Sequence, residues 1–444
     1  MTQLDIQADR GTQLVLASDQ TLRFDEARLR LERASLFLTS QTAGNEHWGQ
    51  AAMLAIAACA TRMFRGGVFV DPALTQPLRV GQRWPTTLAK ALIDAGCRAE
   101  TPPGTALRLH VGADPIEGQA QLYCWADGWT AVVSPDASKI VPKHGNALSG
   151  ALCGAMAVTE AFRKVVLNDL LACRRPQSFA LWPDAEETAI TYLPSALWLI
   201  GLGNLGQATL FTLGLLPFDD TSEVKLLLQD DDVAGPENLP VQVLTRYDWI
   251  GKRKARSAAA WAEARGFSTT LCERRFRAGD GPGAEEPRIA LVGIDNLEGR
   301  RHIAAAGFDF VADAGLGATG PEAFDIRLHA FPGARTPDRA WPEPPLAAPG
   351  ELPAAYQALV DEGRLDDCGA MTIAGKSVGV PATALAAAAL QLTQVCRHIA
   401  TGGRYSDLID VSLRNTGRAV IHDFERPDLI RLGFRRSAEV KGPI

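Results

Sequence analysis

Short hydrophobic runs alternate with stretches of helical composition through the second half of the chain. The runs predict buried strands at residues 196–200, 224–228, 288–292 and 309–312. The segments between them predict helices at 207–216 and 252–265. Strands that alternate with helices in this order are typical of an α/β fold with mostly parallel, doubly wound sheets. In such sheets the ligand site lies at the carboxyl ends of the strands.

Two sequence marks occur twice, in the same order. Residues 44–51 and 201–208 share Gly-x4-Gly-Gln-Ala ahead of an alanine-rich helix. Residues 159–163 and 393–397 share a Thr-x3-Arg spacing after a run of small residues. Two alanine-rich helices can look alike by chance, but the preserved order favours an internal duplication. The second copy carries a large insertion between its two marks.

Length and composition agree with two folded units. The chain has 444 residues, of which 46% are hydrophobic and 22% charged, so it exceeds the size of a single core and is not a disordered or fibrous protein. We predict a domain at 1–180 and a second at 181–444. The second includes a crossover segment at about 330–370, where proline and glycine are frequent.

Charge and cysteine usage exclude several classes of protein. The net charge of −6 favours no nucleic-acid partner. The N-terminus lacks the pattern of a signal peptide, and the apolar stretch 378–392 is too short to span a membrane. The eight cysteines form no C-x-x-C pair, which argues against a zinc ribbon or a dithiol site. We therefore expect a cytoplasmic protein without a membrane segment.

The most specific local signal is a glycine-rich turn between the first predicted strand and helix. Gly201, Gly203 and Gly206 form Gly-x-Gly-x-x-Gly, in which backbone N–H groups can approach phosphate oxygens. The aspartates 230–232 follow the next strand, where an acidic side chain can bind ribose hydroxyls. A plain tight turn or the dinucleotide site of an NAD(P)-dependent oxidoreductase would share the glycine pattern.

Three further motifs follow in order, at residues 236–242, 250–255 and 292–301. They read Pro-Glu-Asn-Leu-Pro-Val-Gln, Ile-Gly-Lys-Arg-Lys-Ala and Val-Gly-Ile-Asp-Asn-Leu-Glu-Gly-Arg-Arg. With the glycine turn and the acidic turn, this series resembles the adenylation domain of the ubiquitin-activating (E1) family and its bacterial relatives in thiamine and molybdopterin biosynthesis. The resemblance covers residues 195–400 and implies two Rossmann-like adenylation folds in tandem.

The resemblance implies ATP and Mg²⁺ as cofactors and assigns the site. The glycines would cradle the phosphates, Asp232 would hold the ribose, Asn238 and the catalytic Lys254 would contact the phosphates, and Asp295 would bind Mg²⁺. The implied nucleotide-binding set is Gly201, Gly203, Asn204, Gly206, Asp230, Asp232, Asn238, Gln242, Lys254 and Asp295. One position departs from the family, because Val241 stands where an arginine would contact the leaving phosphates. Arg246 is a candidate substitute.

Cys368 is the predicted nucleophile. It follows the run Trp341-Pro-Glu-Pro-Pro, which resembles the crossover segment that carries the acyl-accepting cysteine in E1-like proteins. A thiolate is a competent acceptor from an acyl adenylate. A structural thiol is the alternative for Cys368, and we expect the other seven cysteines to be structural.

The first half resembles an inactive copy. Glu46 stands where the second copy has Gly203, and its β-carbon and charge would obstruct and repel phosphate. Family members work as pairs of folds in which an arginine of one reaches the nucleotide of the other. Arg28 or Arg23 could supply this arginine. Because both copies lie in one chain, we expect a pseudo-dimer without an obligate homodimer.

By resemblance, the function would be activation of a ubiquitin-like protein that ends in glycine. Adenylation and thioester formation would precede transfer to an E2-like protein, as in bacterial conjugation systems implicated in antiphage defence. The alternatives are a sulfur-carrier adenylyltransferase of cofactor biosynthesis, an NAD(P)-dependent oxidoreductase and a non-catalytic scaffold that binds a ubiquitin-like tail.

Overall fold

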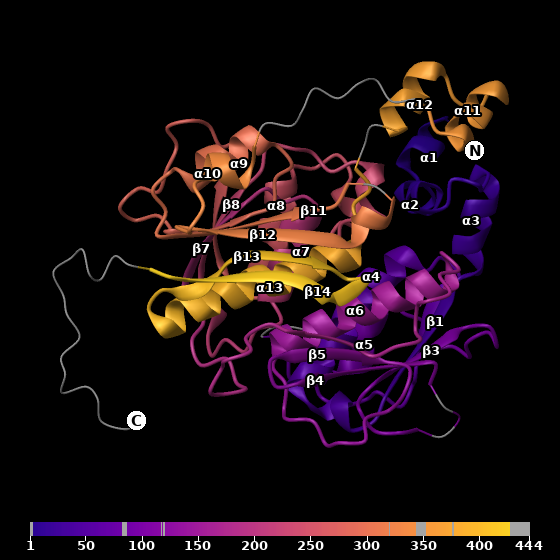
Figure 1. Cartoon of the computed structure of the whole chain (residues 1–444), viewed down its shortest axis with the longest axis horizontal. Helices are drawn as coiled ribbons and strands as arrows, with labels where there is room; N and C mark the ends of the chain where they lie inside the picture. The colour runs from indigo at the N-terminus through magenta and orange to yellow at the C-terminus, as the bar shows by residue number, and fades with distance from the viewer. Residues whose placement is uncertain are drawn as a thin grey trace.

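Two β-sheets lie on either side of a layer of long helices in the computed structural model (Figure 1). The structure describes residues 3–81, 87–116, 118, 120–318, 320–342, 352–374 and 377–426. In the view of Figure 1, the first half of the chain forms the lower sheet and the second half the upper one.

The first sheet has six strands in the order β2-β1-β3-β4-β5-β6. The strands β2, β1, β3 and β4 run parallel to one another, whereas β5 and β6 are antiparallel to their neighbours. The bounds are β1 (Ser35–Ser40), β2 (Gly67–Val70), β3 (Leu107–Val111), β4 (Leu122–Asp127), β5 (Thr130–Ser134) and β6 (Gln177–Ala180).

The second sheet has eight strands in the order β14-β13-β12-β11-β10-β7-β8-β9. The five strands from β11 to β9 are parallel, and β12, β13 and β14 are antiparallel additions. The bounds are β7 (Ala196–Ile200), β8 (Lys225–Gln229), β9 (Ser268–Cys272), β10 (Ile289–Val292), β11 (Phe310–Leu316), β12 (Asp325–Phe331), β13 (Arg404–Ser412) and β14 (Asn415–Glu425).

The two sheets repeat one topology. The run β8-β7-β10-β11-β12-β13 has the same strand order and the same directions as β2-β1-β3-β4-β5-β6. In both halves the longest helix connects the fifth strand of this run to the sixth. The prediction of two α/β folds in tandem is confirmed. The second half adds β9 at one edge and β14 at the other.

Thirteen α-helices surround these sheets in the described part of the chain. Their bounds are α1 (Gln3–Ala8), α2 (Arg10–Ser18), α3 (Phe24–Arg33), α4 (His47–Met63), α5 (Leu88–Asp94), α6 (Ala147–Val165), α7 (Asn204–Leu213), α8 (Lys254–Glu263), α9 (Leu297–Ala304), α10 (Pro337–Ala340), α11 (Ala354–Asp361), α12 (Asp367–Ala374) and α13 (Pro381–Thr401). None of the described helices is both long enough and apolar enough to cross a membrane.

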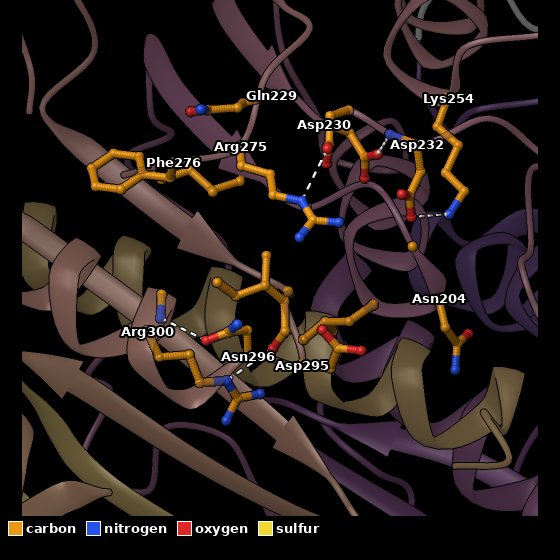
Figure 2. A pocket seen from close by; sticks show the side chains of 18 of the residues that line it. Asn204, Gln229, Asp230, Asp232, Lys254, Arg275, Phe276, Asp295, Asn296 and Arg300 are labelled. Atoms are coloured by element: carbon orange, nitrogen blue, oxygen red, sulfur yellow. Dashed lines mark hydrogen bonds and ion pairs between the residues drawn. The ribbon is translucent and has the colours of Figure 1, made fainter. Parts of the chain in front are cut away.

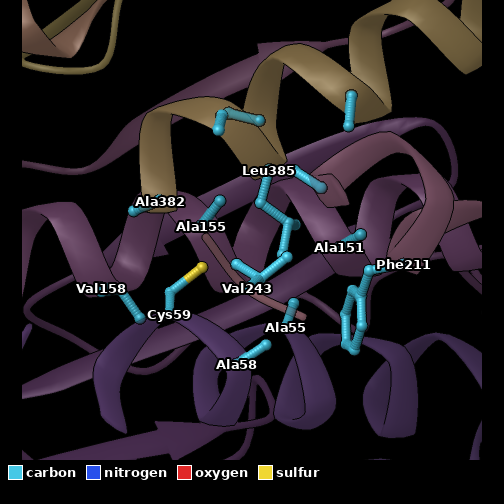
Figure 3. Packing of buried hydrophobic residues seen from close by; sticks show 14 of the residues in the cluster. Ala55, Ala58, Cys59, Ala151, Ala155, Val158, Phe211, Val243, Ala382 and Leu385 are labelled. Carbon is cyan, nitrogen blue, oxygen red and sulfur yellow. The ribbon is translucent and has the colours of Figure 1, made fainter. Parts of the chain in front are cut away.

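Small residues allow the helices of the two halves to pack closely. Helices α4, α6, α7 and α13 meet at the centre of the molecule through alanines and a few larger apolar side chains (Figure 3). Within the first half, a β-carbon at Gly150 of α6 would lie 2.1 Å from the carbonyl oxygen of Trp48 on α4, and α13 of the second half packs on both of these helices. The alanine-rich runs therefore form the interface between the halves, where close approach maximises dispersion contacts.

The repeated Thr-x3-Arg motif places one arginine of each half near the interface between the halves, called the seam below. Arg163 of α6 donates a hydrogen bond to the carbonyl oxygen of Arg414 in the second half, at 3.3 Å. Arg397 of α13 forms an ion pair with Asp184, at 3.7 Å, just beyond the first sheet. Both arginines are almost fully buried. The Thr-x3-Arg motif thus contributes buried arginines to the contact between the halves.

Candidate functional site

A cavity of about 1010 Å³ opens at the carboxyl edge of the second sheet (Figure 2). Its walls come from the ends of β7, β8, β10 and β11, and from the segments that follow them. Of the predicted nucleotide-binding set, every residue except Gly206 lines this cavity. The doubly wound topology explains this convergence, because the carboxyl ends of adjacent parallel strands share one edge.

The three glycines of the turn are needed for different reasons. Gly201 has φ +86°, and a β-carbon there would lie 2.6 Å from Ile294. A β-carbon at Gly206 would lie 1.8 Å from the carbonyl oxygen of Gly201, so this glycine lets the turn pack on α7. At Gly203 a β-carbon would meet nothing within 4 Å. The turn is therefore open at Gly203, where a ligand can approach the backbone.

Two aspartates of the acidic turn after β8 make different kinds of contact. Asp230 accepts hydrogen bonds from the backbone N–H groups of Leu202, at 2.6 Å, and Asp232, at 2.7 Å. Burial raises its pKa, whereas these hydrogen bonds favour the carboxylate. Asp230 thus fixes the glycine turn to the acidic turn. Asp232 is exposed, and its carboxylate pairs with Lys254 Nζ at 2.9 Å, so two predicted ligand contacts also touch each other.

Only one predicted acidic residue of the cavity is without a partner among the described residues. Asp230, Asp231 and Asp232 lie close enough together to hold a cation. Each is already engaged, Asp231 by Arg275 at 3.0 Å. Asp295 is exposed in the cavity and makes no hydrogen bond or ion pair with the described chain. Its hard oxygen ligands fit Mg²⁺.

Arg300 holds the loop that carries Asp295. Its Nε donates to the carbonyl oxygen of Ile294, at 2.9 Å, and its Nη2 to that of Ala314, at 3.1 Å. Asp313 lies 3.3 Å from Nη1 and is completely buried, which raises its pKa to about 6. The guanidinium therefore joins the ends of β10 and β11 beneath the cavity (Figure 2).

Residues 236–245 form the opposite wall of the cavity. Asn238 uses its Oδ1 to accept the N–H of Gly235, at 2.9 Å. Gln242 is buried, and its Oε1 accepts from Gln207 Nε2 at 2.7 Å and from Thr245 Oγ1 at 3.0 Å. Although Gln242 borders the cavity, its side chain therefore ties the wall to α7.

The structure does not bring Arg246 to the place left by Val241. Val241 lines the cavity, but Arg246 pairs with Asp248 at 3.1 Å and lines a second cavity behind residues 236–245. Residues 236–245 themselves therefore contribute no arginine to this wall of the cavity. Asn204, at the start of α7, also lines the cavity, and its buried Oδ1 has no hydrogen-bond partner in the described structure. A ligand donor would satisfy this oxygen.

The arginine that reaches the cavity from the first half is Arg10, which the sequence analysis missed. It begins α2, directly after Asp9, whose side chain caps that helix by accepting Thr12 N at 3.1 Å. Burial lowers its pKa, and the carboxylate of Glu237 raises it. Arg28 pairs instead with Glu32 at 2.7 Å and lines the second cavity. Arg28 is not among the described residues that line the nucleotide-site cavity, so the structure gives no support to the predicted finger at Arg28, which stays a prediction.

Cys368 lies in α12, within the segment between β12 and α13. Its side chain lies outside the described residues, as do residues 343–351 of the proline-rich run. Helix α12 contacts α1, and α11 contacts α3. Arg364, between α11 and α12, forms two hydrogen bonds of 2.9 Å with Asp25 of α3. The N-terminal helices therefore support both Arg10 and the segment that carries Cys368.

The other cysteines are core residues in most cases. Cys59, Cys97, Cys124, Cys153 and Cys396 are buried, and Cys173 and Cys272 are partly exposed. Burial raises the pKa of Cys59, Cys97, Cys173 and Cys396 to about 12. Thiols of this kind are protonated at neutral pH and are poor nucleophiles.

Comparisons with known proteins identify a family for both halves of the chain. The model of the BilD N-terminal domain matches residues 36–181, and that of the BilD C-terminal domain matches residues 193–402. A curated bacterial E1-like protein BilD of Collimonas sp. (strain OK412) is 37% identical over 297 residues. The match spans 64% of this chain and 64% of that relative.

Solved structures of E. coli MccB also match, although at a greater distance. One covers 52% of this chain and 62% of its own at 16% identity, with a TM-score of 0.34. The structure titled E. coli MccB + ATP covers 52% and 63% at 17% identity, with a TM-score of 0.33.

Proposed function

The chain belongs to the bacterial E1-like family that the two BilD domain models describe, and on this premise we propose that it adenylates the C-terminal carboxylate of a ubiquitin-like protein. ATP would be the second substrate, and Mg²⁺ would be held by Asp295. Transfer of the acyl group to Cys368 and then to an E2-like protein would follow. The family resemblance is our reason for proposing a role in antiphage defence.

One arrangement carries the proposal. The open backbone at Gly203 faces a cavity that also holds the cations of Lys254 and Arg10 and the carboxylate of Asp295, which has no partner among the described residues. Phosphate oxygens require backbone donors and cations, and a metal that bridges them requires a free carboxylate. Asn204 and Asn238 add amide groups to the same space.

The reaction needs charge stabilisation more than acid or base catalysis. A carboxylate oxygen of the substrate attacks the α-phosphorus, and the bond to the bridging oxygen breaks, so that pyrophosphate leaves with the electron pair. Negative charge grows on the leaving oxygen, which Lys254 and Arg10 can stabilise from fixed positions. When bound, Mg²⁺ neutralises charge on the phosphates. The thiolate of Cys368 would then displace AMP from the acyl carbon.

The first half would contribute structure and Arg10 but no second nucleotide site. Residues 74–80 fold over its glycine turn, and Leu74 and Val80 are buried there. We therefore expect one ATP per chain. Isothermal titration of the purified protein with ATP and Mg²⁺ measures this number, and a stoichiometry near two would contradict it.

The adenylation step is tested by ATP–pyrophosphate exchange. The full chain is incubated with Mg²⁺, ATP, labelled pyrophosphate and a candidate ubiquitin-like protein that ends in glycine. We expect exchange that depends on the terminal glycine of the ubiquitin-like protein. Absence of exchange with an intact tail would refute adenylation.

The thioester step is tested separately on a non-reducing gel. We expect an adduct that a thiol reductant cleaves and that Cys368→Ala abolishes, while this variant still supports pyrophosphate exchange. Cys272→Ala is the matched control, because Cys272 is a partly exposed thiol of the second half. An adduct that survives in Cys368→Ala would contradict the assignment.

A further inference from the structure

Arg62 makes an unusual contact across the seam between the halves. It lies near the end of α4 in the first half. Its Nε donates to the carbonyl oxygen of Gln242 at 2.9 Å, and its Nη2 to that of Thr245 at 3.2 Å. Its Nη1 donates to Ala58 of its own helix at 3.0 Å. One guanidinium of the first half therefore binds two backbone carbonyls of the second.

The two carbonyls belong to the wall of the candidate site. Residues 236–245 separate the nucleotide cavity from the second cavity, because Asn238 and Val241 line the first whereas Leu239 and Leu244 line the second. Arg62 itself lines the second cavity. It holds this wall from behind and does not enter the nucleotide cavity.

A continuous hydrogen-bond network leads from Arg62 to the glycine turn. Gln242, whose carbonyl Arg62 binds, uses its side chain to accept from Gln207 of α7 at 2.7 Å. Gln207 Nε2 also donates to the carbonyl oxygen of Leu202, at 3.1 Å, and its Oε1 accepts from the N–H of Leu244, at 3.2 Å. Loss of the Arg62 contacts would therefore shift both residues 236–245 and the glycine turn, which form two walls of the cavity.

The charge of Arg62 is not balanced by a neighbouring acid. Its only hydrogen-bond acceptors in the described structure are backbone carbonyls, and it forms no ion pair there. Burial lowers its pKa to about 10, so the group remains a cation at neutral pH. A partly buried cation held by carbonyls contributes positive potential at short range. It lies behind Val241, where the family pattern would place an arginine.

The duplication shows that this contact is an addition. In the first half, Gln50 ties the glycine turn to the segment that follows β2, through Nε2 to the carbonyl oxygen of Pro77 at 2.9 Å and through Oε1 to Arg79 N at 2.6 Å. Gln207 performs the corresponding task in the second half. Among the described residues, only this segment of the second half receives an arginine of the other half in addition to the glutamine.

We infer that Arg62 is a positioning residue for the active site of the other half. It holds residues 236–245 at the distance from the glycine turn that the phosphates of the nucleotide require, and its charge partly replaces the arginine absent at Val241. This inference rests on the proposed function for the identity of the ligand. The placement of the wall can be tested without it.

The first experiment measures amide hydrogen exchange in the ligand-free full-length protein. We expect Arg62→Gln to accelerate exchange in peptides that cover residues 236–245 by about tenfold or more. Peptides that cover residues 74–80 should be unaffected. Arg98→Gln is the control, because Arg98 stacks on Phe69 in the same half and touches neither cavity. Unchanged exchange at 236–245 in a folded Arg62→Gln protein would overturn the inference.

The second experiment measures ligand affinity and kinetics. We expect Arg62→Gln to raise the Kd for Mg²⁺-ATP about tenfold, and to raise the KM for pyrophosphate in the exchange reaction more than it lowers kcat. Arg62→Lys, which keeps the charge but can bind fewer carbonyls, should recover part of the affinity. Equal affinities in the wild type and both variants would overturn the inference.

The two experiments separate this inference from the proposed function. If the wild type neither binds ATP nor catalyses exchange, the proposed function fails, and the hydrogen-exchange result still decides whether Arg62 holds the wall. If the wild type is active and Arg62→Gln matches it in all measurements, only the role of Arg62 fails.

Discussion

The glycine turns that precede α4 and α7 have similar backbone geometry, but the first is covered by protein and the second opens into a cavity. Helix α4 begins after Glu46 and α7 after Gly203, so the two residues occupy the same N-cap position. The next glycine in each turn, Gly49 or Gly206, brings its α-carbon against a backbone carbonyl. In the second half the turn opens into a cavity. In the first half Gly44 lies against Gln76, from the segment that covers the turn.

The carboxylates that follow the equivalent strands β3 and β10 show the same contrast. The sequence Val-Gly-x-Asp begins at the last residue of each strand, so that Asp114 follows β3 as Asp295 follows β10. Asp114 accepts a hydrogen bond from Thr42 Oγ1 at 3.1 Å, whereas Asp295 has no partner in the described structure. A ligand site can thus be lost by supplying each of its groups with a partner from the chain, while the fold around it is retained.

The largest expected effect separates the two aspartates. Asp295→Ala should slow ATP–pyrophosphate exchange about a thousandfold, or about 4 kcal/mol, because the metal loses its carboxylate. Asp114→Ala should change the exchange rate less than about twofold. Similar losses in both variants would show that the halves are not functionally distinct.

The next effect should be common to both halves. Gly206→Ala and Gly49→Ala should each reduce the free energy of unfolding by about 3 kcal/mol, because the new β-carbon would lie 1.8 Å or 2.0 Å from a carbonyl oxygen. Gly203→Ala, whose β-carbon meets open space, should cost less than about 1 kcal/mol. Urea unfolding measures all three, and a tolerated Gly49→Ala would break the equivalence of the turns.

Arg10 and Arg28 test how the first half reaches the cavity of the second. Arg10→Gln should reduce kcat/KM for ATP in the exchange reaction about thirtyfold, or about 2 kcal/mol, since a cation is lost from the cavity. Arg28→Gln removes only a pair with Glu32 on the helix surface, and its effect should stay within about twofold. The reverse order of effects would favour Arg28 over Arg10 as the arginine that acts on the nucleotide.

The smallest effect concerns the covered site itself. His110 occupies the position on β3 that Leu291 occupies on β10, and burial lowers its pKa from 6.5 to about 4. Because the unfolded chain binds this proton first, the stability contributed by neutral His110 is present above pH 6.5 and is lost as the pH falls toward 4.

His110→Leu should therefore lose less stability between pH 7 and pH 5 than the wild type, by about 1.5 kcal/mol. Loss of the contact with Thr39 should lower stability at both pH values, so the difference between them is the quantity measured. An unchanged difference in urea unfolding would contradict the buried, neutral state.

Local patterns were sufficient to predict the parts of the site that depend on backbone geometry. The strand at 196–200, the glycine turn and the helix after it were predicted because buried strands, tight turns and phosphate approach each demand particular residue types.

The local patterns could not predict which side chains from distant segments of the chain would pair. Nothing local indicates that Gln242 turns toward Gln207 or that Lys254 pairs with Asp232. Arg10 was missed because its approach depends on the path of α1 and α2 across the seam. The repeated Val-Gly-x-Asp was visible in the sequence and would have strengthened the duplication.

Fusion of the halves has a consequence for how the cavity behaves at low concentration. The contacts of Arg62 and Arg10 with the second half form within one chain, so their effective concentration is set by covalent connection and not by protein concentration. Two separate subunits would dissociate on dilution and leave each cavity without its neighbour's arginines. Here every folded molecule supplies its own Arg10 and Arg62 to its second half, with one of each for every cavity.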